Sequence, residues 1–400
     1  MSRFLFVVPP LAGHVNPGVA VDQALRERGH DVAWAGSEAY LRPLLGPDAR
    51  VYPTGMRPYR GQLDTGTAAL RSLWEGFVVP FARFTLPAVD RAAREYRPDV
   101  LVVDQHAVAG ALVAYRHGLR WASLVPQSME LTHPLRGLPT VDTWIRDHLM
   151  RLWQHADLPP EEFQDPRFSP HLVVAFTTTA LTGGAFPGHF ALVGPALGGR
   201  PSGTGFPWGS LDPARQRVLV TVGTLAADVA RDFYGRAVEA LRPVGDRLQA
   251  IVVAPVEAVP QPPAPAGSSR VRAAADVLVV PRVPLLDLLP HLDAVVCHGG
   301  LNTVCESLAY GVPLVVAPIK HDQPVNAAQV AAAGAGIRVR FPRVRPDQLR
   351  AAVVAVLDDP AYRAAAARIR DSFAAAGGAA TAAERLAALA RSTVDIGSAS

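Results

Sequence analysis

Residues 280–336 have the sequence VPRVPLLDLLPHLDAVVCHGGLNTVCESLAYGVPLVVAPIKHDQPVNAAQVAAAGAG. The short apolar run at 294–297 is typical of a strand buried in a parallel sheet. The tripeptide HGG at 298–300 follows at once, and its two glycines let backbone N–H groups approach a ligand without obstruction by side chains. We expect Asn302 to cap a helix that runs to about Tyr310. The stretch therefore predicts a strand, a tight glycine turn and a helix, in that order.

The start of this helix is predicted to bind an anion. Backbone N–H groups and the positive end of the helix dipole favour a diphosphate at such a position. Glu306 lies four residues after Asn302, one turn further along the same face, where its carboxylate can accept hydrogen bonds from a ribose. Asp322 and Gln323 lie in a loop after the predicted strand 314–317, where they can bind sugar hydroxyls.

At these residues the sequence resembles a known family. The pattern H-x-G-x-N-[ST]-x-x-E, followed by G-V-P and D-Q, is similar to the nucleotide-sugar motif of GT-B glycosyltransferases. The likeness is closest to inverting enzymes that glycosylate lipophilic natural products such as plant secondary metabolites, macrolides and enediynes. In one departure, Arg282 stands before Val283-Pro284 where relatives often carry an aromatic residue that stacks on the nucleotide base, although a guanidinium can stack too. The residues assigned to donor binding are Thr224, Arg282, Val283, His298, Gly299, Gly300, Asn302, Thr303, Glu306, Asp322 and Gln323.

Structural alternatives exist for parts of this motif. A Gly-Gly turn before a helix is common in α/β proteins, and His298 alone could be a core histidine. Cys297, His298 and Cys305 do not have the spacing of a usual zinc site, so both cysteines are expected to pack as small apolar residues. Residues 221–224 either line the donor site or simply end a strand with a tight turn. The combined motif spans more than forty residues and is far more specific than a bare GxGxxG.

The beginning of the chain predicts a similar arrangement of strand, helix and strand. The apolar run at 4–8 predicts the first strand, and the run at 31–35 predicts the second. Between them, Asn16 is expected to cap a helix whose first position is Pro17. This βαβ start predicts a doubly wound parallel sheet that binds ligands outside the carboxyl ends of its strands. A second strand–loop–helix system begins at 217–222.

The domain organisation follows from the length and from one linker. Four hundred residues suggest two domains of ordinary size, and the stretch 194–213 is rich in Gly, Pro and Ser. The resemblance implies the GT-B architecture, in which two Rossmann-like doubly wound domains face each other across a cleft. The predicted parts are an N-terminal acceptor-binding domain (1–200), a linker (201–214), a C-terminal nucleotide-sugar-binding domain (215–376), a C-terminal helix that packs back on the N-terminal domain (377–392) and a tail (393–400).

Composition limits the remaining classes of function. A net charge of +4 is small for 400 residues, and no Lys/Arg cluster forms a nucleic-acid patch. Two cysteines give no disulfide framework and favour a reducing cytosol. The apolar run at the N-terminus is too short to span a membrane and lacks a small-residue cleavage site. We expect a cytoplasmic monomer or homodimer that neither binds nucleic acid nor inserts stably in a membrane.

Glycosyl transfer requires a base for the acceptor hydroxyl. His14 lies at the carboxyl end of the first strand. Histidine has the right chemistry for a base, because the unperturbed pKa of an imidazole lies near neutrality. Asp104 ends another strand at the same edge of the sheet, where its carboxylate can orient His14 and stabilise the imidazolium. The pattern G-H-x-x-P at 13–17, together with Asp104, also resembles the catalytic dyad of the family. Alternatively, His14 is a loop histidine without a role and Asp104 is a solvated carboxylate or a structural cap.

The leaving group is a nucleotide diphosphate, whose charge His298 and the helix start at Asn302-Thr303 can stabilise. No Asp-x-Asp pair occurs in the sequence, so no obvious carboxylate pair is present to hold a metal on the phosphates. We expect the protein to need no metal and no cofactor beyond the nucleotide diphosphate sugar itself, which is a co-substrate. The resemblance agrees with this expectation.

A lipophilic acceptor requires an apolar pocket. The segments 74–84 and 129–153 contain large apolar side chains that could line it, although such residues are more often ordinary core. The candidate acceptor-binding residues are Trp74, Phe77, Phe81, Met129 and Trp144.

The sequence therefore predicts an inverting glycosyltransferase. It would move a sugar or deoxysugar from a TDP or UDP donor to a hydroxyl of a lipophilic natural product, with His14 as general base. One alternative is a nucleotide-sugar epimerase or hydrolase of the same fold, which fits His14 less well. Another is a catalytically silent helper or binding protein, which an intact pair of His14 and Asp104 disfavours.

Overall fold

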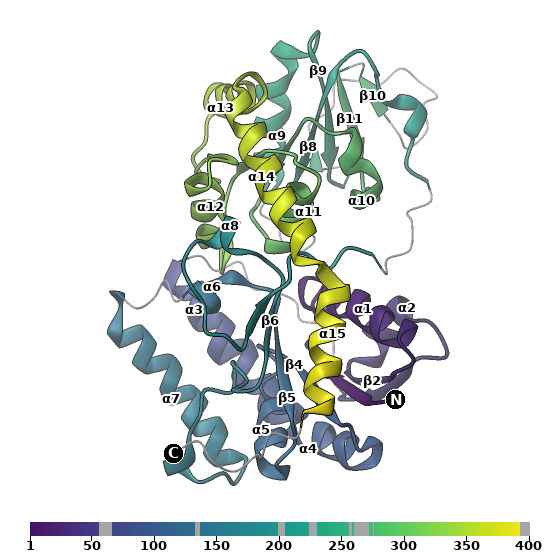
Figure 1. Ribbon diagram of the computed structural model, residues 1–400. Helices are drawn as coiled ribbons and strands as arrows, with labels where there is room; N and C mark the ends of the chain where they lie inside the picture. The colour runs from purple at the N-terminus through teal and green to yellow at the C-terminus, as the bar shows by residue number, and fades with distance from the viewer. Residues whose placement is uncertain are drawn as a thin grey trace. The chain divides into compact units, whose positions relative to one another are not determined.

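The computed structural model is shown in Figure 1, and it describes residues 1–55, 66–132, 137–198, 205–223, 230–255, 258–259, 272–274 and 276–392. Thr224, the tail 393–400 and the first part of the predicted linker lie outside the described residues. The chain divides into two compact units. The first unit comprises Met1–Arg200 and Phe373–Ser400, and the second comprises Pro201–Ser372.

The first unit is built on a seven-stranded sheet with the strand order β3-β2-β1-β4-β5-β6-β7. Every neighbouring pair in it is parallel, which confirms the predicted doubly wound sheet. The strand order reverses between β1 and β4, the place where such sheets bind ligands. The strands are β1 (Arg3–Val7), β2 (Asp31–Gly36), β3 (Arg50–Pro53), β4 (Val100–Asp104), β5 (Trp121–Val125), β6 (Val173–Ala175) and β7 (Phe190–Leu192).

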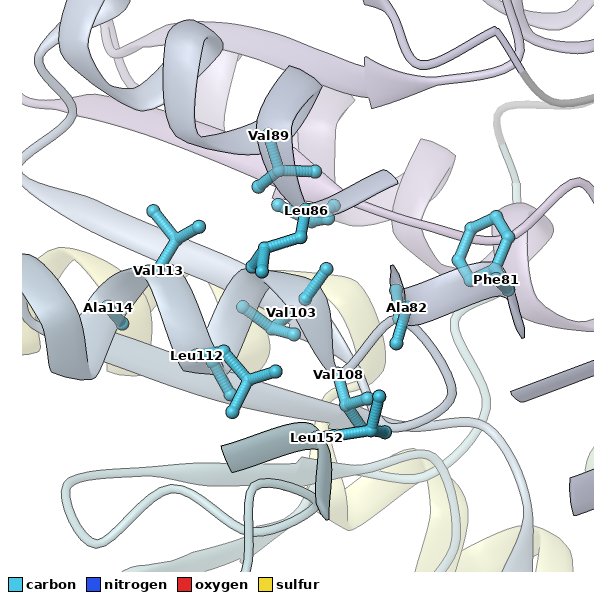
Figure 2. Packing of buried hydrophobic residues seen from close by; sticks show 14 of the residues in the cluster. Phe81, Ala82, Leu86, Val89, Val103, Val108, Leu112, Val113, Ala114 and Leu152 are labelled. Carbon is cyan, nitrogen blue, oxygen red and sulfur yellow. The ribbon is translucent and has the colours of Figure 1, made fainter. Parts of the chain in front are cut away.

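Helices cover both faces of this sheet because alternate strand residues point to opposite sides. Leu5 and Val7 pack in one apolar cluster with α4, α5 and α7, whereas Phe4 and Phe6 pack in another with α1 and α15. Figure 2 shows part of the first cluster, in which side chains of α4 and α5 surround Val103 of β4. The helical segments of the first unit are α1 (Ala12–Glu27), α2 (Glu38–Leu45), α3 (Gly66–Leu73), the π-helical turn η1 (Trp74–Val78), α4 (Val79–Tyr96), α5 (Ala109–His117), α6 (Ser128–Thr132), α7 (Pro139–His155), the 3-10 turn η3 (Pro160–Glu162), α8 (Thr179–Thr182) and α15 (Gly378–Arg391).

The second unit repeats the design with a sheet of order β10-β11-β9-β8-β12-β13-β14. All its pairs are parallel except β10 with β11. Its strands are β8 (Gln216–Thr221), β9 (Leu248–Val253), β10 (Arg272–Ala274), β11 (Val277–Val280), β12 (Ala294–Cys297), β13 (Leu314–Val316) and β14 (Gly336–Arg338). Its helical segments are η4 (Trp208–Ser210), α9 (Arg231–Leu241), η5 (Arg242–Val244), α10 (Leu285–Leu288), η7 (Leu289–His291), α11 (Leu301–Ala309), α12 (Gln323–Ala332), α13 (Pro346–Asp358) and α14 (Pro360–Ala376), whose last turn belongs to the first unit.

Two predicted helix starts are wrong. Helix α1 begins at Ala12 rather than at Pro17, because the carbonyl of Leu11 accepts hydrogen bonds from the N–H groups of His14 and Val15, both at 3.0 Å. His14 therefore lies in the first turn of the helix, not before it. Helix α11 begins at Leu301 and is capped by Gly300 instead of Asn302, since the carbonyl of Gly300 accepts the N–H of Val304 at 3.1 Å.

Helix α15 lies beside α1 in the first unit (Figure 1). Its side chains Ala382, Ala383 and Leu386 are fully buried in the cluster that also holds the sheet residues Phe4 and Phe6. The last helix is thus part of the core of the first unit. Among the described residues, no helix is long and apolar enough to cross a membrane.

We predict that Leu386→Ala destabilises the first unit by about 2–5 kcal/mol, because it removes a fully buried side chain from a packed core. The neighbouring variant Arg385→Ala changes an exposed position and should stay within about 0.5 kcal/mol of the parent. Denaturant unfolding followed by circular dichroism and tryptophan fluorescence measures both. Equal stability of the two variants would contradict this role of α15.

Candidate active site

His14 and Asp104 meet at the edge of the first sheet. The parallel pairing of Val7 with Val103 places the chain after β1 beside the end of β4. Nδ1 of His14 lies 3.0 and 2.9 Å from the two carboxylate oxygens of Asp104, and both side chains are buried, at 5% and 0% exposure. The N–H of His106 donates to Oδ1 of Asp104 at 2.9 Å, so the carboxylate is itself held in place.

This contact assigns the imidazole tautomer. A carboxylate only accepts hydrogen bonds, so Nδ1 of His14 carries the hydrogen and Nε2 carries the lone pair. The side-chain amide nitrogen of Gln127 lies 2.8 Å from that Nε2 and donates to it. His14 is therefore arranged to accept a proton at Nε2.

A second pair of buried ionisable residues adjoins the first. The rings of His106 and His14 have centroids 4.8 Å apart, and Nε2 of His106 lies 3.5 Å from Oε1 of Glu130. Gln105 donates to the other oxygen of Glu130 at 2.7 Å. Burial alone would raise the pKa of Glu130, but the hydrogen bond and charge of His106, with the charge of Arg167, lower it to about 2. Glu130 is thus ionised throughout the physiological range.

His106, Glu130 and Gln127 were not among the residues predicted from the sequence. A signal was present, because Gln105-His106 directly follows Asp104 at the end of β4, and Gln127 and Glu130 follow β5. Since β4 pairs with β5, polar residues after these two strands meet at one edge of the sheet.

In the second unit, His298 is enclosed by glycines. β12 lies between β8 and β13, which brings the segments after these strands to the same edge. A Cβ on Gly223 would lie 2.7 Å from Cε1 of His298, and a Cβ on Gly300 would lie 2.9 Å from its Nε2. A Cβ on Gly299 would lie 2.8 Å from Cγ1 of Val316. The glycines predicted for the turn are required here by the close approach of their neighbours.

Burial lowers the pKa of His298 to about 4. The imidazole is therefore neutral near pH 7, although the residue as a whole is only half-buried. A neutral ring can donate one hydrogen bond to an anion while adding no charge that would have to be desolvated.

The loop before α12 is tied to the glycine turn. The side-chain amide of Asn326 donates to the carbonyl of Gly299 at 2.8 Å and to Oδ2 of Asp322 at 2.7 Å. The side-chain oxygen of Gln323 accepts the N–H groups of Ile319 and Lys320, both at 2.9 Å. Asn326 is only 1% exposed and was also missed by the sequence analysis. The predicted sugar-binding pair thus has its positions set by internal hydrogen bonds.

The remaining predicted donor residues are distributed around this edge. Asn302 and Thr303 are half-buried in the first turn of α11, and Glu306 is buried one turn further on. Arg282 is exposed and Val283 is half-buried in the segment between β11 and α10. Their roles in donor binding stay predictions.

The chain is similar to known glycosyltransferases over almost its whole length. The solved structure of the spinosyn rhamnosyltransferase SpnG complexed with thymidine diphosphate aligns with a TM-score of 0.72 and 25% identity, over 96% of this chain and 100% of that chain. A family model described as erythromycin biosynthesis protein CIII-like, C-terminal domain, matches residues 247–389. The elloramycin glycosyltransferase ElmGT of Streptomyces olivaceus is 29% identical over 93% of each chain. The 4'-demethylrebeccamycin synthase of Lentzea aerocolonigenes is 32% identical, over 94% of this chain and 96% of that protein.

The chain belongs to the GT-B glycosyltransferases of natural-product biosynthesis. The family, the enzyme class and the fold predicted from the sequence are thereby confirmed.

The aromatic residues predicted to bind the acceptor of this glycosyltransferase differ in their surroundings. Trp74, Phe77 and Phe81 are at most 2% exposed and belong to the apolar core cluster that contains Val103. Met129 and Trp144 are half-buried. The structural alternative of ordinary core therefore describes the packing of the first three, and the acceptor role of all five stays a prediction.

No group of three or more His, Cys, Asp or Glu side chains that could hold a metal ion occurs within the described part of this glycosyltransferase. Cys297 and Cys305 are both buried, and burial raises the pKa of the Cys297 thiol to about 12.

We predict that His298 titrates with a pKa of about 4 in the folded glycosyltransferase, against 6.5 for a free imidazole. The unfolded chain then binds a proton at His298 more readily than the folded one, so this residue reduces stability as the pH falls from about 6.5 to about 4. NMR titration of the ring Cε1–H signal, assigned with His298→Gln, measures the value. A pKa near 6.5 would contradict the described burial.

Proposed function

We propose that this glycosyltransferase moves a sugar or deoxysugar from a nucleoside diphosphate donor to a hydroxyl of a lipophilic natural product, with inversion at the anomeric carbon. The observation that carries the proposal is the buried contact between Nδ1 of His14 and the carboxylate of Asp104. It leaves the lone pair of Nε2 as the proton acceptor, which is what a general base requires.

In the proposed step, the acceptor oxygen attacks the anomeric carbon while its proton passes to Nε2 of His14. The bond between the anomeric carbon and the diphosphate oxygen breaks, and its electron pair leaves with the diphosphate. A single displacement of this kind inverts the anomeric configuration. The carboxylate of Asp104 stabilises the imidazolium that forms, because it already accepts the hydrogen of Nδ1.

The second unit supplies the proposed donor site. The leaving diphosphate would lie at the start of α11, where backbone N–H groups, the helix dipole and the neutral ring of His298 stabilise its growing negative charge. Asp322 and Gln323 would bind the hydroxyls of the sugar, and Glu306 those of the ribose. The exposed guanidinium of Arg282 would stack on the nucleotide base.

We propose thymidine diphosphate sugars as the preferred donors. The proposal is supported by SpnG, a structural relative at 25% identity that is complexed with thymidine diphosphate. Helix α11 and His298 would stabilise the diphosphate without a metal ion, so we further propose that transfer needs neither a metal nor another cofactor.

The central test is His14→Ala. We predict that it still binds thymidine diphosphate and loses transfer by about a hundredfold or more, as expected for removal of a general base. Asp104→Asn should lose less, because the base remains and only its orientation is weakened. Transfer is measured by mass spectrometry on a panel of TDP and UDP sugars with lipophilic acceptors.

Circular dichroism and thermal unfolding control for the folding of both variants, and calorimetric binding of thymidine diphosphate controls for the donor site. Near-normal transfer by His14→Ala would remove His14 from the mechanism. Unchanged transfer by Asp104→Asn would remove the orienting role of Asp104. Turnover of the donor that never produces a glycosylated acceptor would favour a hydrolase or an epimerase.

The donor site is tested separately by Gly300→Ala. The added methyl group would lie 2.9 Å from Nε2 of His298, so the ring must move. We predict that thymidine diphosphate binds about tenfold more weakly, which corresponds to roughly one lost hydrogen bond. Gly209→Ala is the matched control, because its Cβ would meet nothing within 4 Å. Equal affinities of the two variants would show that His298 does not contact the diphosphate.

A further inference from the structure

The proton-accepting atom of His14 is already occupied. The amide nitrogen of Gln127 donates to Nε2 of His14 at 2.8 Å, on the side of the ring opposite to Asp104. Because Nδ1 holds the only ring hydrogen, this lone pair is the one that must take the proton of the acceptor hydroxyl. Gln127 and the acceptor therefore compete for a single atom.

The backbone that carries Gln127 is anchored on both sides. Gln127 follows β5, and Ser128 at the start of α6 is fully buried. One turn further on, Glu130 accepts a hydrogen bond from the amide of Gln105 at 2.7 Å and lies 3.5 Å from Nε2 of His106. Gln127 itself is only half-buried. Its backbone is thus fixed by buried contacts, while its side chain is partly exposed to solvent.

We propose that Gln127 is a positioning residue that caps the base of this glycosyltransferase and keeps water from it until an acceptor hydroxyl displaces the amide. The inference rests on the proposed role of His14 as general base. Gln127 belongs neither to the nucleotide-sugar motif nor to the pair of His14 and Asp104, so its function is an addition to both.

The cap suppresses a specific side reaction. With Nε2 exposed, a water oxygen can attack the anomeric carbon of a nucleoside diphosphate sugar while its proton passes to His14. The bond from the anomeric carbon to the diphosphate oxygen then breaks, its electron pair leaves with the diphosphate, and the free sugar is lost. The amide of Gln127 prevents this by holding the lone pair that would receive the proton of water.

The cap distinguishes water from acceptor by binding energy. The amide is tethered beside His14, so its effective concentration there is high. A water molecule that replaces it makes no additional contacts with the enzyme that would favour the replacement. A lipophilic acceptor buries its apolar body in the enzyme, and that binding energy can be used to displace the amide. Only a molecule that also binds the enzyme away from His14 can therefore displace the amide of Gln127 from Nε2.

The test compares hydrolysis of a TDP sugar without acceptor with transfer in the presence of acceptor. We predict that Gln127→Ala and Gln127→Met both raise the ratio of hydrolysis to transfer, by about three- to tenfold, the effect of one hydrogen bond. Gln127→Met keeps roughly the length of the side chain and removes the amide group, including its N–H donors. Gln164→Ala, which changes an exposed glutamine of the same unit, should leave the ratio at its parent value.

The double variant His14→Ala/Gln127→Ala separates the inference from the proposed function. If Gln127 acts through His14, the extra hydrolysis disappears in the double variant. An unchanged ratio in both single variants, or a rise in Gln127→Ala alone, would overturn the hydrogen-bonded cap. Loss of transfer in His14→Ala together with an unchanged ratio in the Gln127 variants would reject the role of Gln127 and keep His14 as the base. Normal transfer in His14→Ala would reject His14 as the base.

Discussion

Parallel pairing of β1 with β4 is the constraint on which the proposed chemistry depends. The chain leaves β1, forms β2 and β3 on one side, and returns to form β4 on the other, so that two segments separated by ninety residues end at one place. The register of Val7 opposite Val103 then brings His14 and Asp104 within 3.0 Å. A shift of β4 by one residue against β1 would turn Asp104 to the opposite face of the sheet, away from His14.

The second unit uses the same architecture for a different electrostatic purpose. In both units a histidine follows a central strand at the carboxyl edge of a parallel sheet. Nδ1 of His14 is hydrogen-bonded to the buried carboxylate of Asp104. His298 lies among glycines, and burial lowers its pKa to about 4, so it remains neutral. The two histidines thus differ in what surrounds each ring: His14 is the proposed base, and His298 is the proposed hydrogen-bond donor to the diphosphate.

The sequence predicted the parts that depend on local patterns. Apolar runs and glycine turns gave the strands, both parallel sheets and the family, and strand-end positions brought His14 and Asp104 together. Helix starts were predicted less well, because Asn16 and Asn302 are good caps locally, yet the carbonyls of Leu11 and Gly300 accept the first helical bonds. The spacing of Trp74, Phe77 and Phe81 could not separate core from pocket, since both use the same helical period. The contacts of Gln127 with His14 and of His106 with Glu130 join side chains from segments far apart in the sequence, which no periodic signal encodes.

The central claim is that Asp104 fixes the tautomer of His14 so that Nε2 accepts the proton. Nitrogen-15 NMR of the ring of His14 at about pH 7, above the ordinary imidazole pKa, measures this most directly. The account predicts a hydrogen on Nδ1 and an unprotonated, hydrogen-bonded Nε2, with loss of this strong preference in Asp104→Asn. A hydrogen on Nε2 in the parent enzyme, or the same tautomer mixture in parent and Asp104→Asn, would contradict it.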